Sequence, residues 1–194
     1  MVEARAKGRL FIISAPSGSG KTTLCKSLLA ENIGLVPSVS ATTRKPRPGE
    51  KDKTDYIFIS KKRFMEMVKA GQFLEYEENF SNLYGTPRRF IQDSLRNGRS
   101  VLLSIDVKGA MKVRRAYPRE SILIFILPPS IKALKKRLLS RMADAAETIS
   151  TRLKLARREI AFKDRYDYRI VNDKLSNAYR RLKKIIISEM AKVE

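Results

Sequence analysis

Apolar residues gather in short continuous runs along this chain, and longer stretches with apolar positions every three or four residues separate the runs. The runs predict strands at Leu10–Ser14, Val36–Ala41, Val101–Ile105, Ile122–Leu127 and Tyr168–Val171. The stretches between them predict helices at Lys21–Glu31, Pro87–Asn97, Lys108–Tyr117, Ile131–Arg141, Glu147–Lys163 and Ser176–Met190. Because a strand that is apolar throughout is buried on both faces, the alternation predicts an α/β fold with a parallel sheet between layers of helices.

Two segments interrupt this alternation. Residues 55–84 contain "DYIFIS", a short helical piece and "FLEYEENFSNLYG", which together predict a small antiparallel insert. Residues 142–146 form an irregular segment between two helices, where Asp144 and Glu147 resemble the N-terminal cap of the following helix. A chain of 194 residues is therefore expected to form one domain that carries an insert.

The segment "SAPSGSGKTT" follows the first predicted strand and leads into the first predicted helix. Gly18, Gly20, Lys21 and Thr22 have the spacing of a P-loop, although Ala15 stands where the general pattern has its first glycine. Glycines allow backbone amides to turn toward a phosphate, and the helix N-terminus adds positive potential. We expect Lys21 to reach the β- and γ-phosphates of a triphosphate and the Thr22 hydroxyl to bind Mg²⁺. The flanking strand and helix argue against a chance turn.

Composition excludes several kinds of chemistry. The chain contains no histidine, which excludes histidine bases, Ser-His or Cys-His nucleophiles and histidine metal ligands. The single cysteine, Cys25, excludes an internal disulfide and fits a reducing compartment. The apolar runs are too short for a membrane span or a signal peptide, so we expect a cytoplasmic protein. The formal charge of +21 favours anionic partners without selecting among nucleotides, nucleic acid and acidic surfaces.

A second basic segment, "SVSATTRKPRPGEKDKTDYIFI", indicates a second phosphate site. Arg44 and Arg47 lie three residues apart beside hydroxyl side chains, and Tyr56 follows. Two guanidinium groups and a phenol suit a terminal phosphate better than a base. A solvated basic loop is the alternative, but Pro46 and Pro48 stiffen the segment and favour a preformed site.

Taken together, the motifs resemble those of the guanylate kinases over essentially the whole chain. The resemblance is carried by the P-loop, "SATTRKPRPGE", "GQFLEYEENFSNLYGTP", "IDVKGA", "LKKRLLSR" and "YDYRIVND". It implies one domain over 1–194, with a three-layer P-loop NTPase core at 8–42, 88–136 and 148–194, a small mixed β/α GMP-binding insert at 43–87 and a helical lid at 137–147. It also implies transfer of the ATP γ-phosphoryl group to GMP, and to dGMP, with Mg²⁺, in purine nucleotide salvage and GTP supply. The GMP phosphate attacks directly, so no protein nucleophile or strong base is needed.

The resemblance also assigns site residues by their matching positions. It assigns GMP binding to Ser40, Arg44, Arg47, Tyr56, Glu75, Tyr84, Gly85, Thr86 and Asp106. It assigns ATP binding to Ala15, Pro16, Ser17, Gly18, Ser19, Gly20, Lys21, Thr22, Thr23, Arg137, Arg141, Asn172 and Asp173, with Thr22 also the Mg²⁺ ligand. It assigns catalysis to Lys21, Arg44, Arg137, Arg141 and Arg152, whose charges would neutralise the transferred group.

Several of these assignments have a plainer structural alternative. Glu75 can accept hydrogen bonds from guanine N1–H and the 2-amino group, a donor pair that adenine lacks, but it could also be a surface carboxylate on a strand. The lid arginines could form a solvated basic helix face. Asn172 and Asp173 could form the turn into the last helix rather than contact adenine.

Three positions depart from the family pattern. Ser104 stands where an acidic residue is usual, so we expect weaker organisation of Mg²⁺ and its water or of the guanine side of the site. Lys53 replaces a glycine and suggests a different turn shape. Met142 replaces a lid glycine and suggests a lid that moves differently.

Two functions from other classes remain open at this point. One is a guanylate-kinase-like binding module that has lost catalysis, although such modules generally have eroded P-loops. The other is a basic P-loop protein that associates with RNA, since residues 130–194 hold 18 Lys and Arg against 8 Asp and Glu. The expected partners are GMP and ATP, with weak electrostatic association with nucleic acid, no membrane, and a monomer or homodimer.

Overall fold

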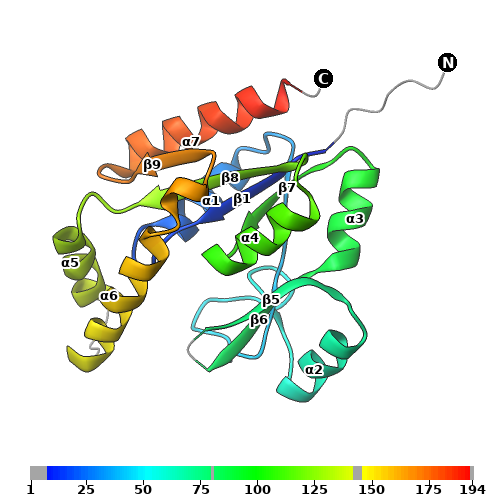
Figure 1. Ribbon diagram of the computed structural model, residues 1–194, viewed down its shortest axis with the longest axis horizontal. Helices are drawn as coiled ribbons and strands as arrows, with labels where there is room; N and C mark the ends of the chain where they lie inside the picture. Colours follow the sequence, from blue (N-terminus) through cyan, green and yellow to red (C-terminus); the bar gives the residue numbers. More distant parts are fainter. Residues whose placement is uncertain (1–7, 80, 142–145, 193–194) are drawn as a thin grey trace.

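A five-stranded parallel sheet runs through the middle of the protein (Figure 1). The structure, a computed structural model, describes residues 8–79, 81–141 and 146–192, with side chains except at 141 and 146–148. The strands lie in the order β2 (Leu35–Pro37), β7 (Ser100–Ser104), β1 (Leu10–Ser14), β8 (Ser121–Leu127) and β9 (Tyr168–Val171). Every neighbouring pair is parallel, which confirms the predicted sheet.

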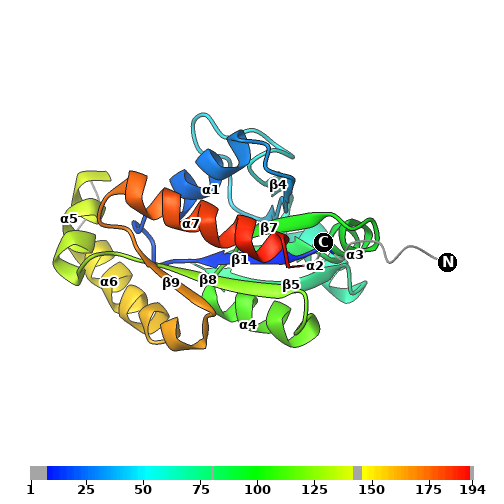
Figure 2. The same ribbon diagram turned by 90° about the horizontal axis from the view of Figure 1, so that it is seen from above.

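Helices cover both faces of this sheet, as Figure 2 shows. The helices α1 (Lys21–Ala30) and α7 (Leu175–Met190) pack on one face, and α4 (Val107–Ala116) packs on the other. Ile91 of α3 (Arg88–Arg96) belongs to the same apolar cluster as α4. In β1, the side chains of Phe11 and Ile13 join the apolar cluster formed with α1 and α7. Those of Leu10 and Ile12 join the cluster formed with α3 and α4. All four side chains are fully buried, which explains why the strand shows no polar alternation.

A second, smaller sheet lies below the main sheet in the view of Figure 1. Its order is β4 (Ile57–Phe58), β3 (Ala41–Thr42), β6 (Asn82–Pro87) and β5 (Phe73–Asn79), and α2 (Lys61–Lys69) packs on it through Phe64 and Phe73. The pairs β3–β6 and β5–β6 are antiparallel, but β3–β4 is parallel. The antiparallel pairing expected within residues 55–84 is confirmed for β5 and β6. The sheet as a whole is mixed, because β4 pairs in parallel with β3, which lies before that segment.

The predicted strand Val36–Ala41 is divided between the two sheets. β2 ends at Pro37 and β3 begins at Ala41, so residues 38–40 carry the chain from one sheet to the other. The Ser38 amide still donates to the Leu102 carbonyl at 2.9 Å, and the Ser40 carbonyl already accepts from Ile57 at 2.9 Å. The local pattern at Val36–Ala41 thus gave no sign of this crossing, which follows from long-range pairing.

Two helices project from one end of the sheet, at the left of Figure 1. They are α5 (Ile131–Arg141) and α6 (Ala146–Ile160), which pack through Leu134, Leu138 and Ala156. The cap expected from Asp144 and Glu147 lies outside the described residues. α6 ends at Ile160 instead of the predicted Lys163, and the short 3₁₀ turn η1 (Lys163–Arg165) turns the chain back toward β9.

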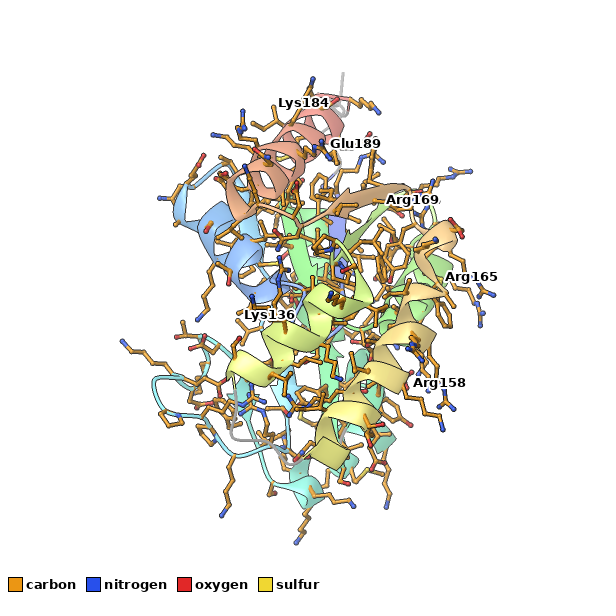
Figure 3. The ribbon with its side chains drawn as sticks, turned by 90° about the vertical axis from the view of Figure 1, so that its left-hand side faces the viewer. Lys136, Arg158, Arg165, Arg169, Lys184 and Glu189 are labelled. Atoms are coloured by element: carbon orange, nitrogen blue, oxygen red, sulfur yellow. The ribbon has the colours of Figure 1, made fainter. Side chains whose placement is uncertain are left out.

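Basic side chains cover the outer surface of this last third of the chain. Figure 3 labels examples from five successive elements, namely Lys136, Arg158, Arg165, Arg169 and Lys184. None of the helices that the structure describes is long and apolar enough to cross a membrane.

Candidate active site

The P-loop forms a tight turn between β1 and α1. Gly18 and Gly20 take positive φ angles of 86° and 89°, in the left-handed region that favours glycine. A Cβ atom on Gly20 would lie 2.4 Å from Nδ2 of Asn172, and one on Gly18 would press on the side chains of α5. Both glycines are therefore required for conformation and for space.

Asn172 ties the P-loop to the end of β9. The side chain is buried, and its amide donates to the Ser19 carbonyl oxygen at 2.8 Å. The Asn172 carbonyl in turn accepts from Arg137 at 2.9 Å. The neighbouring Asp173 is exposed and accepts from the Lys174 amide, as expected for a turn. Asn172 thus supports the loop's backbone, while its predicted contact with ATP stays a prediction.

Lys21 begins α1 at the mouth of the site. Its Nζ donates to the Ile105 carbonyl at 3.2 Å, beside the end of β7. Burial lowers the pKa of Lys21, while the negative charges of Asp106 and Glu159 oppose this shift. No side chain caps α1, so its first amides are available to an anion.

A cavity of about 260 Å³ lies between the main sheet and the smaller one. It brings together eleven of the predicted site residues, namely Ala15, Ser17, Lys21, Ser40, Arg44, Arg47, Tyr56, Glu75, Tyr84, Asp106 and Arg152. The other predicted residues do not line it, namely Pro16, Gly18, Ser19, Gly20, Thr22, Thr23, Gly85, Thr86, Arg137, Asn172 and Asp173. The side chain of Arg141, the last residue of α5, lies outside the described part of the structure.

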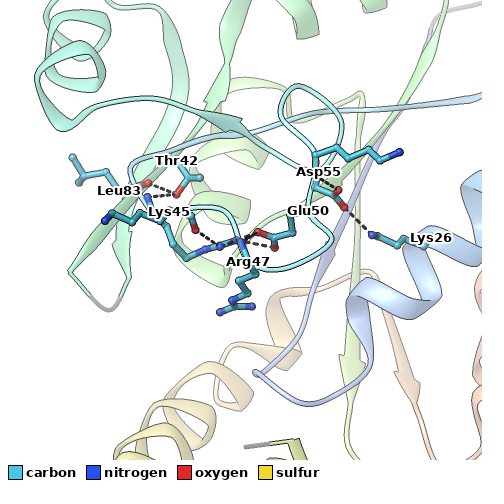
Figure 4. Close-up of polar contacts among 9 residues, drawn as sticks. Lys26, Thr42, Lys45, Arg47, Glu50, Asp55 and Leu83 are labelled. Carbon is cyan, nitrogen blue, oxygen red and sulfur yellow. Dashed lines mark hydrogen bonds and ion pairs between the residues drawn. The ribbon is translucent and has the colours of Figure 1, made fainter.

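The two arginines of the second basic segment, Arg44 and Arg47, differ in their surroundings; Figure 4 labels Arg47 and its neighbour Glu50. The Arg44 guanidinium makes two parallel 2.9 Å bonds with the Glu50 carboxylate and lies over the Tyr56 ring, 5.3 Å from its centroid. Glu50 also accepts from the Arg47 amide at 2.8 Å. The Arg47 guanidinium makes no ion pair with any described residue, so it is available to an anionic ligand. These contacts fix the shape of the loop, while its role as an anion site stays a prediction.

Glu75 projects from β5 toward the N-terminal end of α4. Its side chain is buried and accepts a short hydrogen bond from the Thr86 hydroxyl on β6. Burial raises the pKa of Glu75 to about 7, the Thr86 bond opposes the rise, and nearby Asp106 adds to it. A Cβ on Gly109 would lie 2.5 Å from Glu75 Oε2, so the glycine makes room for this carboxylate. Glu75 is therefore not the surface carboxylate that was the alternative.

Asp106 uses both carboxylate oxygens within the protein. Oδ1 accepts from the Gly109 amide at 2.8 Å and caps α4, and Oδ2 accepts from Asn79 Nδ2 at 2.7 Å. Asn79 lines the cavity but escaped the sequence interpretation, because a single Asn at a strand end carries no signal. Its position is decided by the β5–β6 hairpin.

Glu159 on α6 is a second cavity residue that the sequence interpretation missed. It lies seven positions after Arg152 and lines the same cavity, together with Leu155 between them. This spacing places the three on one helix face, which is a signal that was available. Burial raises the pKa of Glu159 to about 7, and the nearby charge of Lys21 opposes the rise.

Comparison with known proteins decides the family. The family model described as guanylate kinase matches residues 7–189. The chain is 46% identical to a guanylate kinase of Oceanobacillus iheyensis over 98% of this chain and 92% of that protein. It is 45% identical to one of Wolbachia pipientis wMel over 97% and 94%, respectively. This chain belongs to the guanylate kinase family.

Solved structures agree with this assignment. The crystal structure of guanylate kinase from Anaplasma phagocytophilum matches with a TM-score of 0.81 and 34% identity, covering 95% of this chain and 87% of that one. The α/β architecture with its P-loop is thus the guanylate kinase fold.

Departures from the guanylate kinase pattern can now be placed. Ser104 is exposed at the end of β7 and lines the cavity. Lys53 takes a φ of 59° and its amide donates to the Tyr56 carbonyl at 2.7 Å. A lysine thus holds the left-handed conformation that glycine adopts more readily. Met142 lies outside the described residues.

Proposed function

We propose that this protein transfers the γ-phosphoryl group of ATP to GMP, yielding ADP and GDP. The observation that carries the proposal is that one cavity contains both halves of the machinery. The P-loop lysine, Lys21, lines its donor side, and Arg44, Arg47 and Glu75 line its acceptor side. ATP is the phosphoryl donor of the guanylate kinase family.

Glu75 provides guanine selectivity in this proposal. An ionised Glu75 accepts from the guanine N1–H and 2-amino groups. Adenine offers no such donor pair, so it would leave a buried acceptor unpaired. The proposal assigns Ser40, Thr86 and Asp106 to the same pocket, and the GMP phosphate to Arg44, Arg47, Tyr56 and Tyr84.

The transfer itself needs little covalent chemistry from the protein. An oxygen of the GMP phosphate attacks the γ-phosphorus of ATP, and the bond from that phosphorus to the β–γ bridging oxygen breaks as ADP leaves. A phosphate oxygen is already anionic, so no general base is required. Lys21, Arg137 and Arg152 stabilise the charge on the transferred group, and the cavity holds donor and acceptor in line.

The residues present fit Mg²⁺ as a companion of ATP. In the described parts of the chain, no three Asp, Glu, Cys or His side chains form a metal site of their own. The Thr22 hydroxyl is exposed at the start of α1 and would hold Mg²⁺, with water and ATP phosphates supplying the other ligands. Bound there, Mg²⁺ supplies positive charge to the phosphate oxygens.

A coupled assay of ADP formation tests the proposal. ATP and Mg²⁺ are supplied with GMP, dGMP, AMP, CMP or UMP at one concentration. We expect turnover with GMP, with dGMP also accepted, and little with the others. Lys21→Ala should lower kcat by about 10²-fold or more, because removal of one preorganised charge from a phosphoryl site has costs of this order. Lys62→Ala on the exposed face of α2 is the matched control and should leave the rate unchanged.

Binding of GMP without turnover by the unmodified protein would refute the enzyme assignment and favour a binding module. We further place the protein in the cytoplasm, as a monomer or homodimer, and attribute to its basic surface only weak association with nucleic acid. Gel filtration and salt-dependent RNA binding test these points separately.

A further inference from the structure

A single ion pair links α1 to the loop that carries the acceptor arginines. Lys26 Nζ lies 2.7 Å from Asp55 Oδ1 (Figure 4). The Asp55 side chain is 16% exposed and that of Lys26 is 68% exposed. Lys26 stands on the helix that begins at the P-loop, and Asp55 stands next to Tyr56 of the acceptor pocket.

The Lys26–Asp55 pair is a polar contact between α1 and the loop at residues 43–56. Among the residues that the structure describes, no other hydrogen bond or ion pair joins α1 to residues 43–56. A second cavity of about 630 Å³ separates the two elements, and both Lys26 and Asp55 line it. Among the described residues, the pair is therefore the one polar contact that spans this cavity between α1 and residues 43–56.

The opposite side of the smaller sheet is attached differently. There β5 meets α4 through the Lys112–Glu77 ion pair of 2.6 Å and the Asn79–Asp106 bond of 2.7 Å. The sheet is thus anchored along α4, whereas on the α1 side the Lys26–Asp55 pair is the one polar contact to the loop among the described residues.

Asp55 connects the ion pair to Tyr56 and Arg44, which are assigned to the GMP phosphate. Its second oxygen accepts from the Lys51 amide at 3.0 Å, which closes the turn before β4. The next residue, Tyr56, supports the Arg44 guanidinium with its ring. Displacement of Asp55 would therefore displace Tyr56 and, through it, Arg44.

We propose that Lys26 and Asp55 are positioning residues that set the distance between the acceptor phosphate site and the P-loop helix. This inference rests on the proposed phosphoryl transfer, because it concerns how the two phosphate sites are aligned. Neither Lys26 nor Asp55 lines the 260 Å³ cavity to which the nucleotides are assigned, so the pair acts on GMP through the loop and should leave ATP binding unchanged. Its mutual stabilisation lowers the pKa of Asp55 and raises that of Lys26, so both groups are charged at neutral pH.

Steady-state kinetics of a double-mutant cycle test the inference. Lys26→Met and Asp55→Asn each remove the charge pair, while the asparagine keeps an oxygen for the Lys51 amide. We expect each to raise KM for GMP by roughly two- to fivefold, the range for a partly exposed ion pair, with KM for ATP unchanged. The double variant should be no worse than either single variant, and Lys26→Arg should retain the original KM.

The Arg63–Glu66 ion pair of 3.2 Å within α2 is the matched control, because it lies in the same insert without bridging to α1. Arg63→Met and Glu66→Gln should change neither KM. Calorimetric titration of GMP onto each Lys26 and Asp55 variant should show the same loss of affinity without any turnover.

Three results would overturn the inference. The first is additive effects of the two substitutions, and the second is equal changes in KM for ATP and GMP. The third is a lower KM for GMP, which would mean that the pair holds the acceptor loop and α1 apart rather than in position. A protein that is inactive without any substitution would instead refute the proposed function. Melting temperatures exclude misfolding. If one single variant fails to fold, the coupling is no longer measured, but the other single variant, compared with Lys26→Arg, still tests whether KM for GMP rises while KM for ATP stays unchanged.

Discussion

Replacement of Glu75 by glutamine should raise stability while it lowers activity. The side chain is 6% exposed, and burial raises its pKa from an ordinary value of 4.5 to about 7. At about 1.4 kcal/mol for each pKa unit, ionised Glu75 costs the folded protein up to about 3 kcal/mol at pH 8. Glutamine keeps the shape and an acceptor for the Thr86 hydroxyl, but carries no charge.

The sign of this effect depends on pH. Below about pH 4.5, Glu75 is protonated in both the folded and unfolded states, so it adds no penalty. Between about pH 4.5 and 7, the unfolded state releases the proton and the folded state keeps it, so the free energy of unfolding falls as the pH rises. Above about pH 7 the penalty is complete and constant. The advantage of Glu75→Gln should therefore grow from pH 4.5 to 7 and then level off.

Urea unfolding of both proteins at several pH values measures this difference. Glu159 has a similarly raised pKa, but it is present in both proteins, so its contribution cancels. Glu78→Gln, on an exposed position of the same strand, should change the free energy of unfolding by less than about 0.5 kcal/mol. A difference between Glu75→Gln and the unmodified protein that is the same at pH 4.5 and pH 8 would refute the reasoning.

Activity should change in the opposite direction. In the proposed function the ionised form of Glu75 binds guanine, so kcat/KM for GMP should rise through about pH 7 in the unmodified protein. Glu75→Gln should lose this dependence. Its kcat/KM for GMP should fall about 100-fold or more, because hydrogen bonds to a charged acceptor are worth about 1.5–3 kcal/mol each.

Three further substitutions test separate parts of the geometry. Gly109→Ala places a Cβ 2.5 Å from Glu75 Oε2 and should raise KM for GMP at least about tenfold with KM for ATP unchanged, since displacement of one binding group costs over about 1.4 kcal/mol. An unchanged KM for GMP in steady-state assays would show that Glu75 does not bind the base. Asn172→Ala removes the 2.8 Å bond to the Ser19 carbonyl and should raise KM for ATP more than KM for GMP, whereas equal effects would mean that Asn172 only stabilises the fold. Lys53→Gly relieves the strain of a φ of 59° and should raise the free energy of unfolding by about 0.5 to 1 kcal/mol in urea titrations. A loss of stability would mean that the extra freedom of glycine in the unfolded chain outweighs this relief.

Local pattern was sufficient where the physical cause is local. The strands Leu10–Ser14 and Tyr168–Val171 have the predicted bounds. In Leu10–Ser14 every side chain is buried, and an apolar run in a two-sided core admits few alternatives. The helix Ile131–Arg141 was likewise predicted residue for residue. The P-loop was recognisable because its function demands glycines and a lysine at set positions between a strand and a helix.

Features that depend on long-range contacts were beyond the sequence pattern. The split of Val36–Ala41 into β2 and β3 follows from pairing with β7 on one side and with β4 and β6 on the other. Asn79 enters the site only because the hairpin brings it to Asp106. Glu50, which shares a sequence segment with Arg44, gave no sign that the two would form a bidentate pair.

The sequence by itself determined the α/β class, the P-loop motif and the guanylate kinase family, and it pointed to the arginine pair Arg44 and Arg47. These are encoded in spacings within short segments, where one motif performs one task. Only the tertiary structure decided the environment of each charge, including the burial of Glu75, the two bonds of Asp106 and the Lys26–Asp55 ion pair. Burial and pairing depend on which distant segments meet, and the free energy of a charge is set by those neighbours rather than by its own position in the chain.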